Sequence, residues 1–142
     1  MMGLDTQYLE KCCKTLSTAL ELLRQAQPES IEFELYRSAC IKEFEIILEQ
    51  CGKLLKKCLK PFFATNREAD LLTFKDIFRH ATLHGFISTD ESARWMNYRD
   101  NRNSTAHDYG EGFANSTLKL LPQFLIDAIH ITFIIQQKSE SI

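Results

Sequence analysis

Glycine and proline are scarce in this 142-residue sequence, with five and three copies respectively. An all-β protein needs many turns, and these two residues are among the commonest turn formers, so their scarcity argues against that class. No stretch alternates apolar and polar residues as a half-buried strand would, and no internal repeat is present. The sequence therefore favours helices from end to end.

Excess charge is also missing, because the formal net charge is only −2. A protein that coats nucleic acid without sequence preference needs a large surplus of Lys and Arg, so this balance argues against that class. A small basic cleft remains compatible with this balance. The apolar fraction of 44% and charged fraction of 25% are ordinary for a globular protein. The length fits one domain, which we expect to span residues 1–142.

The cysteines lack the patterns of a disulfide framework or a zinc site. They are odd in number and contain no C-x-x-C pair, so we expect reduced, buried thiols and neither a metal nor another cofactor. The N-terminus has no basic segment followed by an apolar run, and no apolar stretch approaches the length of a membrane span. We therefore expect a cytoplasmic protein without a membrane partner. The five thiols are Cys12, Cys13, Cys40, Cys51 and Cys58.

Apolar residues recur at three- and four-residue steps, which is the pattern of amphipathic helices. Two long helices are predicted first, over Thr6–Gln25 and Ile31–Leu59, the second stopped by Pro61. A polar loop is expected from Ala64 to Leu72. Two capping-box signatures, Thr73 with Asp76 and Ser88 with Glu91, then open further helices.

The first of these is predicted over Phe74–His84 and the second is expected to fray between Arg102 and His107. Pro122 lies in the last apolar stretch and predicts either a kink or the start of the final helix. The predicted fold is all-α, an antiparallel helical bundle with a four-helix up-and-down core and short extra helices.

The segment from Arg102 to Tyr109 carries the most distinctive chemistry. An arginine can clamp a phosphate through its rigid fork of donors, and a histidine such as His107 can take and give protons near neutral pH. The two side chains converge only if the helix ends between them. A simpler interpretation stays open, in which Arg102 pairs with Asp100 or Asp108, His107 caps a helix end and Tyr109 is core.

Other candidates are more simply explained as structural. Asp76, His80 and His84 recur every four residues and could face a metal, but a solvated helix face is the better interpretation because H-E-x-x-H is absent. A basic patch is expected to be solvated too, and His130 is expected to be a core or interface residue. The patch comprises Lys53, Lys56, Lys57 and Lys60, and three aromatic residues are predicted to be core: Phe44, Trp95 and Phe124.

The run from Trp95 to Tyr109 resembles the signature of the HEPN superfamily. It is most similar to the bacterial nucleotidyltransferase substrate-binding protein branch, whose pattern is approximately Tyr-Arg-Asp-x-Arg-Asn-x-x-x-His-x-Tyr. The similarity extends over essentially the whole chain. It includes Phe44-Glu45, the run from Thr73 to Asp76, and the run from Leu121 to Leu125.

This resemblance implies a small helical dimer that works beside a separate minimal nucleotidyltransferase. Many such pairs are toxin–antitoxin modules in which the HEPN protein is a metal-independent ribonuclease. It implies that Arg102 and His107 are catalytic and that Asn103 and Arg99 bind substrate. Tyr109 matches the tyrosine that the partner modifies with nucleotide units.

Acid–base chemistry adds a constraint, because cleaving RNA through its own 2′-hydroxyl needs one group to remove a proton and another to supply one. The motif holds one histidine, so a homodimer with its two-fold axis beside the motif would supply both groups. Two functions therefore stay open. One is a ribonuclease, and the other is a non-catalytic subunit that docks on the transferase and presents its substrate.

Overall fold

The computed structural model describes residues 3–104 and 111–140, and within those ranges the chain forms helices and no strand. The helices and their bounds are α1 Gln7–Gln25, α2 Ile31–Leu59, the 3₁₀ turn η1 Lys60–Phe62, α3 Asn66–Asp70, α4 Phe74–Leu83, α5 Thr89–Ser104 and α6 Glu111–Glu140.

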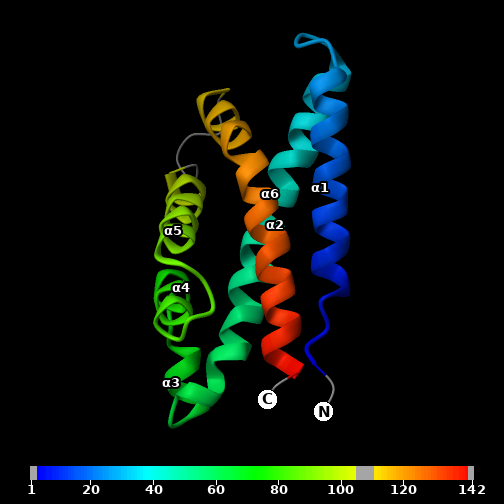
Figure 1. The fold of residues 1–142 in the computed structure, drawn as a ribbon. Helices are drawn as coiled ribbons and strands as arrows, with labels where there is room; N and C mark the ends of the chain where they lie inside the picture. The colour runs from blue at the N-terminus through cyan, green and yellow to red at the C-terminus, as the bar shows by residue number, and fades with distance from the viewer. Residues whose placement is uncertain (1–2, 105–110, 141–142) are drawn as a thin grey trace.

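Four columns of helix run alternately up and down (Figure 1). α1 rises, α2 returns antiparallel to it, α5 rises, and α6 descends between α5 and α1. α4 packs antiparallel to α5, since Lys75 at its start pairs with Asp100 near the end of α5. The all-α bundle predicted from the sequence is confirmed. Both ends of the described chain lie at the same end of the bundle, where the Leu4 amide donates to Ser139 Oγ at 3.1 Å. The C-terminal end of α5 and the N-terminal end of α6 lie towards the opposite end.

Capping explains where the predicted helices begin. Ser30 accepts from the Phe33 amide at 3.0 Å and opens α2 at the predicted residue. At α4, Thr73 and Asp76 form a complete capping box, with both reciprocal bonds at 3.2 Å. The hydrogen bonds of the Thr73 side chain and amide lower the pKa of the Asp76 carboxyl.

Three details differ from the sequence-based expectations. The expected loop from Ala64 to Leu72 contains the short helix α3, which Thr65 caps. Pro122 lies inside α6, so of the two predicted alternatives the one in which it starts the final helix is wrong. Only half of the second capping box forms: Ser88 accepts from the Glu91 amide at 3.1 Å, while the Glu91 carboxylate turns towards α6.

The core is built around packed aromatic rings, as predicted for Phe44, Trp95 and Phe124, each fully buried. Phe124 of α6 meets Phe44 of α2 edge-on, with ring centroids 4.7 Å apart, and Trp95 of α5 at 5.6 Å. Phe78 of α4 stacks on Trp95 at 4.8 Å. Since such aromatic pairs add about 0.5–1.5 kcal/mol each beyond burial, this cluster ties α2, α4, α5 and α6 together.

One expectation about membranes needs correction. The segment Ala114–Ser139 of α6 is long and apolar enough to cross a membrane, by length and composition only. Nearly half of it is buried inside the protein, where α6 packs on α1, α2 and α5. A core helix passes the same test, so this is weak evidence for a span.

All five cysteines are buried, and their desolvation gives a testable pH dependence. Burial raises the pKa of Cys13, Cys40 and Cys58 to about 11, and it raises the pKa of Cys51 as well. A thiol whose pKa is higher in the folded state than in the unfolded state holds its proton more tightly when the protein is folded. The stability that these thiols contribute is therefore fully present below pH 9 and is lost as the pH rises towards about 11.

We therefore expect the free energy of unfolding, measured with urea, to fall steadily as the pH rises from 9 to 11. The Cys40→Ala variant should show a shallower fall, because one of the raised thiols is gone. Equal unfolding free energies for the parent protein at pH 8 and pH 10.5 would contradict this expectation.

Candidate nucleic-acid site at the end of α5

The arginines of the motif lie at the C-terminal end of α5, where α2 supplies acidic partners. Arg102 Nε lies 3.7 Å from Glu45 Oε1, and Arg99 Nη1 donates to Glu49 Oε1 at 2.7 Å. The Arg99 guanidinium also sits 5.0 Å from the centre of the Phe74 ring. About a third of the Arg102 side chain is exposed, so its guanidinium is oriented by the fold and still reaches the surface.

Asn101 fastens the end of α5 to the start of α6. Its Nδ2 donates to Thr117 Oγ1 at 2.8 Å, and its Oδ1 accepts from Ser116 Oγ at 3.0 Å. Thr117 is fully buried, so this clasp is anchored in the core. The clasp holds together the two helices that flank residues 105–110, which lie outside the described part of the structure.

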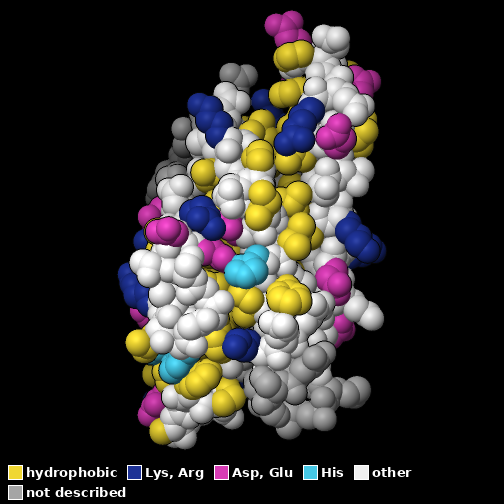
Figure 2. Space-filling view, viewed as in Figure 1, with side chains coloured by type: hydrophobic (Ala, Val, Ile, Leu, Met, Phe, Trp, Pro, Cys, Tyr) yellow, Lys and Arg dark blue, Asp and Glu magenta, His cyan; other side chains and the backbone are white. Residues whose placement is uncertain are grey.

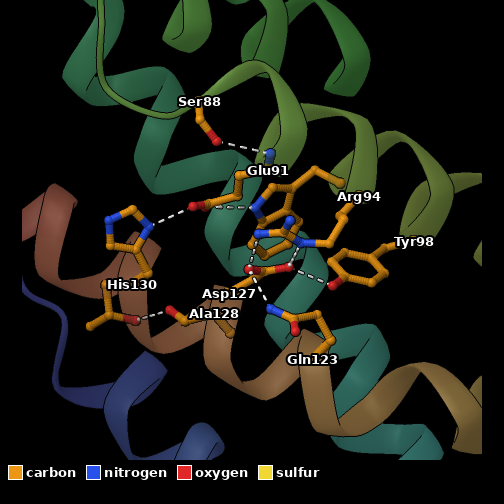
Figure 3. Close-up of polar contacts among 10 residues, drawn as sticks. Ser88, Glu91, Arg94, Tyr98, Gln123, Asp127, Ala128 and His130 are labelled. Carbon is orange, nitrogen blue, oxygen red and sulfur yellow. Dashed lines mark hydrogen bonds and ion pairs between the residues drawn. The ribbon is translucent and has the colours of Figure 1, made fainter.

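A buried carboxylate, that of Asp127, holds α5 against α6 (Figure 3). Asp127, 2% exposed, accepts two bonds of 2.8 Å from Arg94, one of 2.5 Å from the Tyr98 hydroxyl and one of 3.2 Å from Gln123. Burial, then the hydrogen bond to Asp127, raises the pKa of Tyr98. Buried charges persist only when they are paired and hydrogen-bonded, and this one is saturated with donors.

A second buried carboxylate, Glu91, lies on α5 one turn before Arg94. Glu91 accepts from the indole nitrogen of Trp95 at 3.2 Å and lies 2.6 Å from His130 Nδ1 of α6 (Figure 3). The His130 side chain is 45% exposed. The prediction that His130 is a core residue is therefore wrong. The interface alternative stays open.

The predicted site residues fall into three groups. Arg99 and Arg102 are brought together on one face of α5 by their three-residue spacing. Asn103 is exposed on the same final turn, away from any core. His107 and Tyr109 lie outside the described residues, as does Asp108, the alternative partner of Arg102. Asp100, the other alternative partner, pairs with Lys75 of α4 at 2.6 Å.

The residues considered for a metal site and for the basic patch make structural contacts. His84 stacks on Phe62 with ring centroids 3.8 Å apart, and His80 meets Phe63 edge-on at 5.0 Å. Asp76 serves the capping box. Within the described ranges, no group of three or more His, Cys, Asp or Glu residues is placed to hold a metal. Of the four lysines ending α2, Lys60 pairs with Asp70 at 3.6 Å.

Sequence reasoning missed Glu49 and Asn101, and it gave Glu45 no role. A signal was present, because Glu45 and Glu49 are four residues apart on α2 and Arg99 and Arg102 are three apart on α5. Each pair lies on one face of its helix. Knowing that the two faces meet requires the tertiary arrangement.

Comparison with known proteins places this geometry in a family. A family model, described as nucleotidyltransferase substrate binding protein like, matches residues 4–136. This chain belongs to that family. The match confirms the resemblance drawn from the run between Trp95 and Tyr109.

One curated relative and two solved structures are similar to this chain. A Haemophilus influenzae protein named probable ribonuclease HepT is 29% identical over 114 residues, covering 80% of this chain and 76% of its own. A solved H. influenzae structure, described as the substrate-binding domain of a nucleotidyltransferase, superposes with a TM-score of 0.79 at 24% identity. It covers 94% of this chain and 100% of that one. A Thermus thermophilus crystal structure matches with a TM-score of 0.64 at 26% identity, covering 88% and 98%.

Proposed function

We propose that this chain is the partner subunit of a separate minimal nucleotidyltransferase and acts as a metal-independent endoribonuclease through a dimeric Arg/His cleft. One observation carries the proposal. Arg102, the first residue of the Arg-Asn-x-x-x-His motif, stands at the exposed end of α5 with its guanidinium oriented from α2 by Glu45. The relative named probable ribonuclease supports the same activity.

The proposed reaction needs only side-chain chemistry. One His107 of a homodimer takes the proton of the RNA 2′-hydroxyl, whose oxygen attacks the adjacent phosphorus. The other His107 protonates the departing 5′-oxygen, so that a cyclic phosphate and a free hydroxyl result. Arg102 from each chain binds the phosphate and offsets the charge that develops on it. Arg99 and Asn103, on the same end of α5, hold the neighbouring backbone.

The partner transferase would silence this activity through Tyr109. Transfer of nucleotide units from a nucleoside triphosphate to the tyrosine oxygen, with release of pyrophosphate, adds negative charge and bulk beside Arg102, which repels an incoming RNA backbone. The two proteins would then form a toxin–antitoxin pair in the cytoplasm, where the buried thiols stay reduced. Incubation with the transferase and its nucleotide should raise the mass of the parent protein and leave that of Tyr109→Phe unchanged.

A second function is favoured by the H. influenzae structure described as a substrate-binding domain. In that case the chain docks on the transferase and presents a substrate without cleaving RNA. The intact Arg102–His107 pair favours the ribonuclease, because a docking surface needs no group able to transfer protons near neutral pH.

The deciding experiment incubates purified protein with RNA in the presence of a chelator, beside Arg102→Ala. We expect the parent protein to cleave and the variant to fail. If the parent protein leaves RNA intact but co-purifies with a co-expressed nucleotidyltransferase, the docking function replaces the ribonuclease.

A further inference from the structure

Positive charge is concentrated on the outer side of α2, on a surface that we call the lysine face. From residue 50 to residue 67 the sequence holds five Lys or Arg residues and no Asp or Glu, although the whole chain has a net charge of −2. On the side of the molecule shown in Figure 2, by contrast, Lys and Arg side chains stand apart, with apolar and acidic side chains between them. The lysine face consists of four residues that recur at three- and four-residue steps and so share one side of the helix: Lys53, Lys56, Lys57 and Lys60.

Three of these lysines have no acidic partner. Lys53, Lys56 and Lys57 form no ion pair with any residue that the structure describes. Glu49 is four residues before Lys53 and would be its natural partner on the helix, but it accepts from Arg99 at 2.7 Å. The lysine face therefore presents charges that nothing in the described part of the chain compensates.

The lysine face adjoins the arginines of the candidate site. Arg99 reaches α2 at Glu49, and Lys53 lies one helical turn beyond Glu49, on the side away from Arg102. At 1.5 Å per residue, Lys60 lies roughly 16 Å along α2 from Glu49, which is room for about five stacked nucleotides at about 3.4 Å each. A strand held at Arg102 can thus continue past Arg99 onto the lysines.

The composition of the lysine face suits a polyanion better than a protein surface. Protein interfaces are enriched in aromatic residues and depleted in lysine, and their buried centres are apolar. Between residues 36 and 60, all of which the structure describes, no large apolar side chain is exposed. Lysines spaced along a helix instead offer separate point charges to the phosphates of a nucleic-acid backbone.

We propose that the lysine face of α2 binds the phosphate backbone of a single-stranded RNA segment that continues from the cleft at Arg102. The contact adds affinity without sequence preference, because it involves phosphates and no bases. Since the chain as a whole is slightly acidic, the lysine face also directs RNA to this side of the molecule. The inference rests on the proposed function in one respect, because the strand is the RNA that Arg102 and His107 cleave.

The first test measures the Kd of fluorescent single-stranded RNA at several salt concentrations for the parent protein and two double variants. Lys53→Gln/Lys56→Gln changes the lysine face, and Lys11→Gln/Lys14→Gln is the matched control, with the same spacing and charge loss on the exposed side of α1. Glutamine forms helices about as well as lysine, so the circular dichroism of both variants should match that of the parent protein.

Each phosphate contact with a single strand contributes about 0.7 to the slope of log K against log salt. The slope for Lys53→Gln/Lys56→Gln should therefore be shallower by about 1.4, while the control keeps the parent slope. Equal slopes for the parent protein and Lys53→Gln/Lys56→Gln, or equal losses in the two variants, would overturn the inference.

RNA length supplies a second readout. An RNA of about four nucleotides fills the cleft alone, whereas one of about twelve also reaches the lysine face. The parent protein should bind the longer RNA more tightly. Lys53→Gln/Lys56→Gln should lose that advantage and bind the short RNA as the parent protein does. If the variant binds both RNAs more weakly by the same factor, the lysines act on the cleft itself and the proposed path along α2 is wrong.

Cleavage of the longer RNA separates binding from chemistry. Because the lysines do not reach the reacting phosphate, Lys53→Gln/Lys56→Gln should need more protein for a half-maximal single-turnover rate and should reach the parent maximal rate. A lower maximal rate with an unchanged half-maximal protein concentration contradicts a role in backbone binding.

The two proposals fail separately. If the parent protein binds RNA through the lysine face but cleaves none, the ribonuclease is wrong and the lysine face stands. If the parent protein cleaves RNA and Lys53→Gln/Lys56→Gln binds and cleaves it identically, the ribonuclease stands and this inference is wrong. If that variant binds RNA normally but no longer co-purifies with a co-expressed nucleotidyltransferase, the lysine face docks that enzyme, which also refutes the inference.

Discussion

His107→Ala is expected to lower the rate of RNA cleavage about 10²- to 10⁴-fold, the usual loss when one acid–base group is removed. In the proposed dimer the substitution removes both the base and the acid, so we expect the upper part of that range. The measurement is a single-turnover cleavage rate on a labelled RNA with protein in excess.

The matched control is His84→Ala. His84 caps the C-terminal end of α4 and is half-buried against Phe62, and it has no part in the proposed cleft. The His84→Ala variant should cleave RNA at the parent rate. His107→Ala should also bind RNA nearly as well as the parent protein, because Arg102 remains to hold the phosphate. Cleavage by His107→Ala at the parent rate would rule out its role in proton transfer.

Asp127→Ala is expected to lower the free energy of unfolding by about 3 kcal/mol, since removing one partner of a buried pair leaves the other uncompensated. Tyr98, which is 2% exposed, would lose the acceptor of its hydroxyl hydrogen bond, and Arg94 would lose both of its bonds to this carboxylate. For a protein of this size the corresponding fall in Tm is roughly 6–12 °C.

Asp100→Ala is the matched control, because its ion pair with Lys75 is equally short but its side chain is 60% exposed. An exposed pair contributes only about 0–1 kcal/mol. Thermal melts of both variants by circular dichroism would measure the contrast. Equal Tm values for the two would show that the Asp127 network does not hold α5 to α6.

The fold was largely readable from the sequence because its signals are local. Ser30 and Pro61 bracket α2, and the apolar period between them is unbroken. The short helix α3 was missed because five residues are too few to show a period. Pro122 left two alternatives open, a kink or a helix start. A proline removes one helical hydrogen bond, but with the rest of α6 packed the helix continues through it, so the second alternative is wrong.

The site could be predicted only in part, because the residues that pair with its arginines lie elsewhere in the sequence. The motif identified Arg99 and Arg102, but Glu45 and Glu49 are about 50 residues earlier and reach the arginines only through the packing of α2 on α5. Asp127 lies in the most apolar helix, and nothing local indicates that it receives donors from α5.

The bond between Leu4 and Ser139 has a practical consequence for handling the protein. Because both described ends of the chain lie together, at the end of the bundle away from the C-terminal end of α5, a surface attachment made at either end would leave the end of α5 facing solution. Immobilised protein should therefore capture RNA, while a bulky fusion placed between α5 and α6 would obstruct it.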